Sequence, residues 1–192
     1  MNSVKLLIPG YAKKLPGGRW DATSATVLIK SGGKRVIIDP GEFPEALTAA
    51  LEKEGLQTGD IDWVVTSHFH GDHAKSAKLF PKDKVYDPFK HFKKLPENLV
   101  IPDTNIKVIY TPGHTDKHIA FIVGTAEGRC GIAADVIWWA DDEEQKTDKE
   151  SLVEHVDIAA KDMVLLMETR KKYYALADYI IPGHGKVFKV PR

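Results

Sequence analysis

The sequence contains one cysteine, Cys130, which excludes an intrachain disulfide and a cysteine-based zinc site. It contains no apolar run near the roughly 20 residues that span a bilayer, so we expect no membrane segment and no membrane partner. The first residues lack a charged segment followed by an apolar stretch and a small-residue cleavage site, so no secretory signal is predicted. These absences lead us to expect a cytoplasmic protein.

The formal net charge at pH 7 is zero, because 27 basic residues balance 27 acidic ones. The whole-chain charge therefore gives no argument for binding nucleic acid. Charge is locally uneven, since Lys75–Lys94 carries seven lysines against two aspartates. A solvated surface is the ordinary interpretation of such a run, although a phosphate-binding face stays open.

Length and composition fit one ordinary globular domain. The chain has 192 residues, of which 43% are hydrophobic and 28% charged. A chain of this size can bury a core without disulfides or partners, so we expect a single domain over residues 1–192. No pattern predicts the oligomeric state.

Short strand patterns alternate with helix patterns along the chain. Strands are predicted at Val4–Ile8, Ala25–Lys30, Arg35–Asp39, Asp62–Thr66, Lys84–Tyr86, Ile106–Thr111, His118–Val123, Arg129–Ala134 and Asp178–Ile181. Helices are predicted from Pro44 to Gly55, after the loop Ser67–His73 through Leu79, and from Lys149 to Ala177, with Asp157 as a point where the last could break. This order favours an α/β (α+β) fold with helices packed over mixed sheets.

Histidines and aspartates gather in loops that directly follow predicted strands. They are His68, His70, Asp72, His73, His114, Asp135 and His184. Loops at strand ends are held in place by a rigid scaffold, and imidazole nitrogen and carboxylate oxygen are ligands that zinc accepts. The set therefore predicts a metal centre.

The spacing of this set predicts two metal ions. The ligands would be His68, His70 and His114 for the first ion, and Asp72, His73 and His184 for the second. Asp135 can offer one oxygen to each ion and bridge them. Two zinc ions, with iron or manganese as alternatives, can share a hydroxide that attacks the substrate. Asp72 is the predicted catalytic residue, because its second oxygen could orient that nucleophile and move a proton.

The ordered motifs resemble the metallo-β-lactamase fold superfamily over essentially the whole chain. The matching segments are Val36–Gly41 with Asp39, His68–His73, Thr111–Thr115, Asp135 and Ile181–Gly185. The resemblance implies a four-layer αβ/βα sandwich with metals at the edge between two mixed sheets. It also implies that Asp39 orders the metal-binding loop without binding metal, as a carboxylate facing a histidine loop would.

Within that superfamily the sequence looks closest to small stand-alone members similar to metallo-β-lactamase domain-containing protein 1. Antibiotic-hydrolysing members lack the bridging aspartate, whereas this chain has Asp135. Flavodiiron members carry a carboxylate where this chain has His70. Members of the group it looks like have been linked to RNA cleavage.

Two activities therefore stay open. The first is a dinuclear zinc hydrolase that cleaves a small-molecule ester, thioester or lactone. The second is a metal-dependent nuclease acting on RNA or single-stranded DNA, which would need lysine or arginine near the metals. Lys75 begins two residues after His73, but the zero net charge favours the first activity. The full ligand set argues against a fold kept only for interaction.

The residues that would contact substrate are less sharply indicated. Candidates are Tyr11 and Trp20 in the glycine-rich segment Gly10–Trp20, together with His118 and Trp138. In the family that the sequence resembles, a hairpin at the position of Gly10–Trp20 often overhangs the site. Trp138 could form an apolar wall, while a strand histidine such as His118 is more often buried and hydrogen-bonded.

Overall fold

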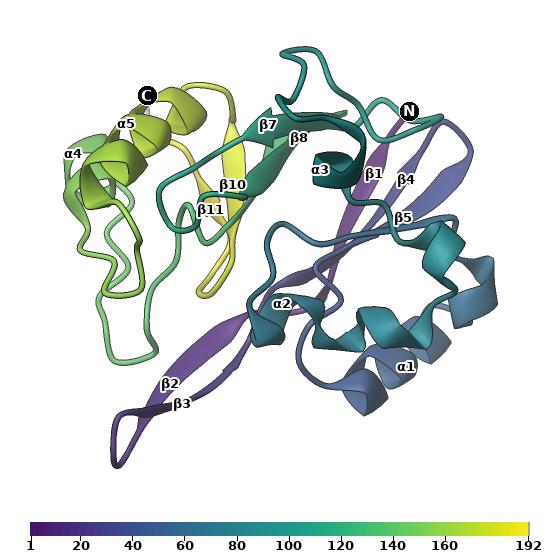
Figure 1. Cartoon of the computed structure of the whole chain (residues 1–192), viewed down its shortest axis with the longest axis horizontal. Coiled ribbons are helices and arrows are strands. Elements are labelled where there is room, and N and C mark those ends of the chain that lie inside the picture. Colours follow the sequence, from purple (N-terminus) through teal and green to yellow (C-terminus); the bar gives the residue numbers. More distant parts are fainter. Residues whose placement is uncertain (192) are drawn as a thin grey trace.

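The computed structural model describes residues 1–191, which form two sheets facing each other (Figure 1). The first sheet has the order β1-β4-β5-β6, with bounds Ser3–Ile8, Thr26–Ser31, Lys34–Ile38 and Trp63–Val65. The second has the order β11-β10-β9-β8-β7, with bounds Phe188–Lys189, Tyr179–Pro182, Gly128–Ala134, Ile119–Thr125 and Lys107–Tyr110. A separate hairpin pairs β2 (Tyr11–Leu15) with β3 (Arg19–Thr23).

Helices cover the outer faces of both sheets (Figure 1). The α-helices are α1 (Pro44–Lys53), α2 (Gly71–Ala74), α3 (Pro88–His91), α4 (Lys149–Glu154) and α5 (Met163–Tyr174). Short 3₁₀ turns lie at Thr58–Asp60, Lys75–Leu79 and Lys82–Lys84.

Three buried apolar clusters separate the layers. Ile29 and Phe121 belong to the cluster between the two sheets. Leu47 of α1 packs on the outer face of the first sheet, and Leu166 of α5 packs on the outer face of the second. The order is therefore helix, sheet, sheet, helix, and the expected four-layer sandwich is confirmed.

Most predicted elements are present, and three differ. The helix predicted after the loop Ser67–His73 begins inside that loop, as α2 (Gly71–Ala74), and continues as the 3₁₀ turn Lys75–Leu79. The predicted strand at Lys84–Tyr86 is wrong: Val85 makes only an isolated bridge to Val64, because a 3₁₀ turn occupies the preceding residues. The predicted helix over 149–177 is two helices, α4 and α5, separated by residues 155–162. The side chain of Asp162 accepts a hydrogen bond from Leu165 N and so begins α5 as a separate helix.

The segment Gly10–Trp20 is mostly the β2–β3 hairpin, which extends away from the sandwich (Figure 1). Its turn contains Gly17 and Gly18, both with positive φ, a conformation that glycine adopts without steric cost.

The strand directions bring the metal-motif loops to one edge. β5 and β6 run parallel, as do β9 and β10. β7 and β9 each pair antiparallel with β8, so they point the same way. The loops after β7, β9 and β10 therefore leave the second sheet at the same end. The loop after β6 meets them there, since Ile119 N at the start of β8 donates to Ser67 O.

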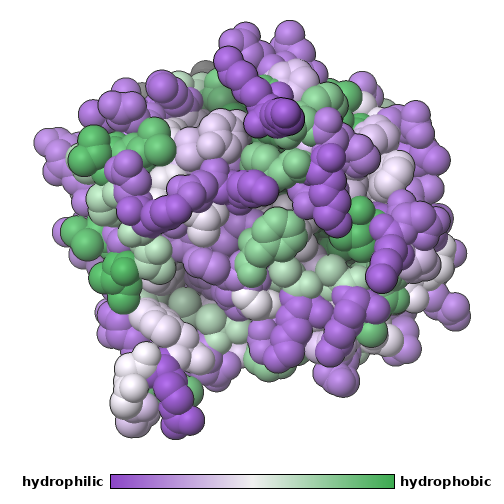
Figure 2. Space-filling model, viewed as in Figure 1, coloured by the Kyte–Doolittle hydropathy of each residue, from purple (hydrophilic) through white to green (hydrophobic). Residues whose placement is uncertain are grey.

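The surface face in Figure 2 is mostly hydrophilic, with apolar side chains in separate small patches. Exposed large apolar residues include Phe69, Val156, Ile158 and Val164. Within residues 1–191, none of the helices combines the length and apolarity needed to cross a membrane.

Candidate metal centre

Seven side chains from the segments that follow β6, β7, β9 and β10 form two adjacent clusters of potential ligands, and two of them, Asp72 and His73, lie on α2. One cluster consists of His68, His70, His114 and Asp135, and the other of Asp72, His73 and His184. Within each cluster the ligand atoms lie within 4.8 Å of one another. Ligands from distant parts of the chain thus converge on two neighbouring points.

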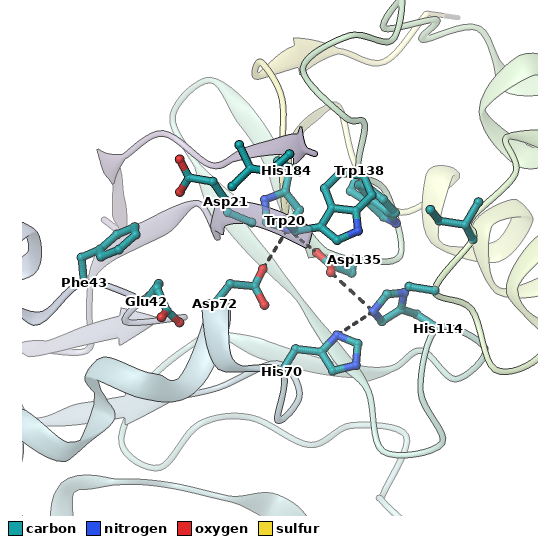
Figure 3. A pocket seen from close by; sticks show the side chains of 15 residues that line it. Trp20, Asp21, Glu42, Phe43, His70, Asp72, His114, Asp135, Trp138 and His184 are labelled. Carbon is teal, nitrogen blue, oxygen red and sulfur yellow. Dashed lines mark hydrogen bonds and ion pairs between the residues drawn. The ribbon is translucent and has the colours of Figure 1, made fainter. Parts of the chain in front are cut away.

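Asp135 lies between the two clusters (Figure 3). Its Oδ2 is 3.4 Å from His114 Nε2 and 3.8 Å from His68 Nε2. Its Oδ1 is 3.1 Å from His73 Nε2 and 3.5 Å from His184 Nε2. One carboxylate oxygen therefore faces each cluster, as a bridging ligand requires.

The position of Asp135 depends on Gly183. A Cβ at Gly183 would lie 2.0 Å from Asp135 Oδ1, so any side chain there would displace the carboxylate. Ala134, just before Asp135, has a φ of +46°, an uncommon conformation for alanine. The loops after β9 and β10 are thus packed as closely as their backbones allow.

Four of the five histidines have Nδ1 held from outside the clusters. The acceptors are Ser67 Oγ for His68 (2.9 Å), Asp39 Oδ2 for His73 (2.8 Å), Asp157 Oδ2 for His114 (2.7 Å), and the carbonyl oxygens of Tyr11 (2.9 Å) and Thr23 (3.1 Å) for His184. An Nδ1–H that donates outward leaves Nε2 as the free ligand atom. The rings are thereby oriented toward the clusters.

Asp39 lies outside both clusters. It connects β5 to the segment His68–His73, which carries ligands of both clusters. Its carboxylate accepts hydrogen bonds from Ser67 N (2.6 Å), from Ser67 Oγ (2.8 Å) and from His73 Nδ1. Asp39 itself has a φ of +48° and is almost fully buried. A buried aspartate in the left-handed conformation fits a positioning role for the His68–His73 loop.

Several ligand atoms of the clusters are buried without a hydrogen-bond partner. They are His68 Nε2, His73 Nε2 and Asp135 Oδ1. Leaving a buried donor or acceptor unsatisfied is costly, so native sites rarely contain several together. A metal ion on each side of Asp135 would satisfy all three atoms, and the residues present therefore fit a two-metal site.

Several side chains of the two clusters have pKa values far from their usual ones. Burial lowers the pKa of His68 well below its usual value. Burial also acts to lower the pKa of His184, but Asp135 and Asp72 outweigh it and raise that pKa to about 9. Burial acts to raise the pKa of Asp135, yet the charges of His73 and His184 hold it well below its usual value. Near neutral pH, Asp135 is thus ionised and His68 neutral, the forms in which each could bind a cation.

The clusters form the floor of an open pocket of about 570 Å³ (Figure 3). Of the four candidate substrate contacts, Trp20 and Trp138 line this pocket. Their rings contact each other edge to face at a centroid distance of 6.0 Å.

The other two candidates do not line the pocket. Tyr11 points its hydroxyl to Asp21, to which it donates a hydrogen bond of 2.8 Å. His118 is fully buried behind His68 and is hydrogen-bonded to Thr111 Oγ1. These two side chains therefore lie away from the pocket wall, and His118 is buried and hydrogen-bonded, as its place in a strand favours.

Sequence reasoning missed Asp157 and the two carbonyl groups that hold His184. The sequence pattern marks Asp157 only as a place where a helix could break, although its carboxylate reaches His114. The interrupted helix pattern indicates that Asp157 lies outside a helix, but no local pattern pairs it with His114.

Known proteins resemble this chain in sequence and in fold. The sequence profile of the Metallo-beta-lactamase superfamily matches residues 18–99. Metallo-beta-lactamase domain-containing protein 1 of Homo sapiens is 30% identical over 211 residues, covering 99% of this chain and 74% of that protein.

Solved structures show the same fold. A provisionally assigned metallo-beta-lactamase from Thermotoga maritima aligns with a TM-score of 0.71 at 20% identity, over 98% of this chain and 99% of that one. AidC, a dizinc quorum-quenching lactonase, aligns with a TM-score of 0.59 at 15% identity, over 90% of this chain and 81% of that one.

The chain belongs to the metallo-beta-lactamase superfamily. The predicted likeness to metallo-beta-lactamase domain-containing protein 1 is also confirmed. The superfamily consists of metal-dependent hydrolases, and this chain has a cluster of histidines and aspartates that could hold metal ions.

Proposed function

We propose that this protein is a hydrolase that uses two zinc ions to cleave an ester, thioester or lactone bond in a small molecule. The supporting observation is the pair of ligand clusters that share Asp135 at the floor of an open pocket. Zinc ions held there would supply a hydroxide nucleophile and polarise the bond under attack. Iron or manganese would suit the same ligands.

The ligands are assigned by cluster. His68, His70 and His114 would hold the first ion, and Asp72, His73 and His184 the second. Asp135 would bind both, since one of its oxygens faces each cluster.

Asp72 is proposed to handle the proton. Its Oδ2 lies 3.2 Å from His184 Nε2, on the side of the second cluster. Its side chain is partly exposed and lines the pocket, and its Oδ1 makes no hydrogen bond within residues 1–191. Oδ1 is therefore free to orient the nucleophile and to pass a proton to the leaving group.

The pocket walls favour a substrate without negative charge. Leu15, Trp20, Phe43 and Ile158 supply apolar surface from three separate segments. The lining residues include four carboxylates (Asp21, Glu42, Asp72 and Asp135) and no lysine or arginine. A polyanion would meet no lysine or arginine side chain on these walls.

The lysine-rich stretch gives the nuclease alternative little support. None of the lysines of Lys75–Lys94 lines the pocket. Lys75 comes near its rim, but there it forms an ion pair with Glu42. Lys84 donates to the carbonyl oxygens of Gly59 and Ile61. Phosphate recognition would need these charges to face the metals.

A substrate panel tests the proposal. Zinc-loaded protein would be assayed on a neutral lactone, a thioester, a β-lactam and an RNA oligomer side by side. We expect turnover of the lactone or the thioester, abolished by chelation and restored by zinc. Turnover of RNA alone, lost in a Lys75→Glu, Lys78→Glu variant, would replace the proposal with the nuclease.

A further inference from the structure

The loop between α4 and α5 reaches the metal centre from outside every recognised motif. Asp157 in this loop is 3% exposed. Its Oδ2 accepts a hydrogen bond of 2.7 Å from His114 Nδ1, while its Oδ1 accepts one from Ala159 N. His114 Nε2, on the other side of the ring, faces Asp135 and His70. The direction in which His114 points therefore depends on where Asp157 lies.

Backbone contacts dock the same loop onto the segment that carries His114. Lys161 N donates to His114 O at 3.0 Å, and Asp162 N donates to Gly113 O at 2.9 Å. A Cβ at Gly113 would lie 2.5 Å from the backbone of Leu166, so the two segments are in close contact. The position of Asp157 relative to His114 is consequently well defined.

Arg170 of α5 holds the loop between α4 and α5 through hydrogen bonds to backbone carbonyl oxygens. Its side chain is fully buried, although arginine is rarely buried without a partner. Nε donates to Val136 O at 2.7 Å, and Nη1 donates to His155 O. Val136 follows Asp135, and His155 lies two residues before Asp157. One guanidinium therefore joins the segment of the shared ligand to the segment that holds His114.

Burial lowers the pKa of Arg170 to about 10, against the opposing effect of Asp157. The group therefore stays charged at neutral pH. Burying this charge against carbonyl oxygens is costly, and an apolar side chain could fill the space. A role in positioning the site explains why a charged group stands here.

We propose that Asp157 is a positioning residue that orients His114 for the first metal cluster, and that Arg170 holds the loop carrying Asp157 in place. This inference rests on the metal-binding part of the proposed function. It concerns one cluster only, because the contacts of Asp157 reach His114 and none of the second-cluster ligands.

A metal titration separates this role from ordinary support of the loop. Metal-free protein would be titrated with Co²⁺, recording the absorption bands of the bound ion and the dissociation constant. Asp157→Ala would be compared with Asp157→Asn, whose amide oxygen can still accept from His114. Asp162→Ala is the matched control, since Asp162 ends the same loop and its carboxylate also accepts a backbone N–H, that of Leu165 in α5, but does not touch His114.

Variants that keep only one cluster show which cluster depends on Asp157 for metal binding. In a His184→Ala background, which keeps the first cluster, Asp157→Ala should weaken Co²⁺ binding about 10- to 100-fold and shift its spectrum. Arg170→Met should weaken it in the same direction. Asp157→Asn should recover most of the affinity, and Asp162→Ala should leave it unchanged. In a His114→Ala background, Asp157→Ala should have no further effect.

Wild-type affinity and spectrum in Asp157→Ala would overturn the inference, as would an equal loss in Asp162→Ala or in the His114→Ala background. Wild-type affinity in Arg170→Met would overturn its second part. If the parent protein bound no Co²⁺ at all, the proposed metal-dependent function would fail instead. Circular dichroism of each metal-free variant shows whether the fold is kept, and Asp157→Asn tests the inference if Asp157→Ala does not fold.

Discussion

The two ligand clusters share Asp135 but are supported in different ways. In the second cluster, His73 is held by Asp39 at the end of β5, and His184 by the carbonyl oxygens of Tyr11 and Thr23 in the hairpin strands. In the first, His114 is held by Asp157 from the α4–α5 loop. The second cluster is therefore supported by strands and the first largely by a loop.

His70 adds to this difference. It is half-buried, and its Nδ1 faces His114 Nε2 at 3.1 Å inside the cluster. Among residues 1–191, no acceptor outside the cluster is hydrogen-bonded to its ring. Support from strands is more rigid than support from a loop, so we expect the first cluster to respond more to changes in its surroundings.

The largest effect should come from Asp135→Ala, because this change affects both clusters together. Removing the carboxylate takes one ligand oxygen from each side and leaves His73 Nε2 and His68 Nε2 without their nearest anion. Elemental analysis after zinc reconstitution should show both ions largely lost. Two tightly held ions with full activity would show that Asp135 is not shared.

Asp72→Asn should affect the rate more than it affects metal binding. The amide keeps a ligand oxygen for the second cluster but cannot take up a proton at neutral pH. We expect kcat to fall roughly 10²- to 10⁴-fold on every substrate that is turned over. Unchanged kcat with two ions bound would remove Asp72 from the proton transfer.

His114→Ala and His184→Ala should separate the clusters. Each change removes one ligand from one cluster, so each variant should bind about one ion tightly and the other weakly. Cobalt spectra of the two variants should differ, because the remaining ligand sets differ. Identical spectra and stoichiometries would indicate a single merged site.

The smallest effect should come from Tyr11→Phe. His184 is held by the Tyr11 carbonyl group, whereas the hydroxyl donates to Asp21. We expect unchanged metal affinity, in contrast to Asp39→Ala, which removes the acceptor of His73. A clear loss of second-cluster affinity in Tyr11→Phe would mean that the hairpin acts through its side chains.

The ligand set and most of the fold could be predicted because their signals are local or periodic. His68 to His73 fall within six residues after an apolar strand pattern, and the remaining ligands also follow strands directly. Parallel strand directions then bring these loops to one edge. Both kinds of information are contained in short stretches of sequence.

The supports of the ligands could not be predicted in the same way. His114 and Asp157 are 43 residues apart, and nothing near either residue indicates the other. The acceptors for His184 are backbone carbonyl groups, which every residue has. Ile158 lies within the stretch predicted as a helix from Lys149 to Ala177, but it is 69% exposed at the pocket, because the helix is interrupted there.

A zinc titration of the metal-free protein, with bound metal measured by elemental analysis, tests the central claim most directly. Two clusters joined by one carboxylate predict a plateau at about two ions per chain, with histidines as most of the ligands. A plateau at one ion or fewer with excess zinc would contradict the two-cluster site.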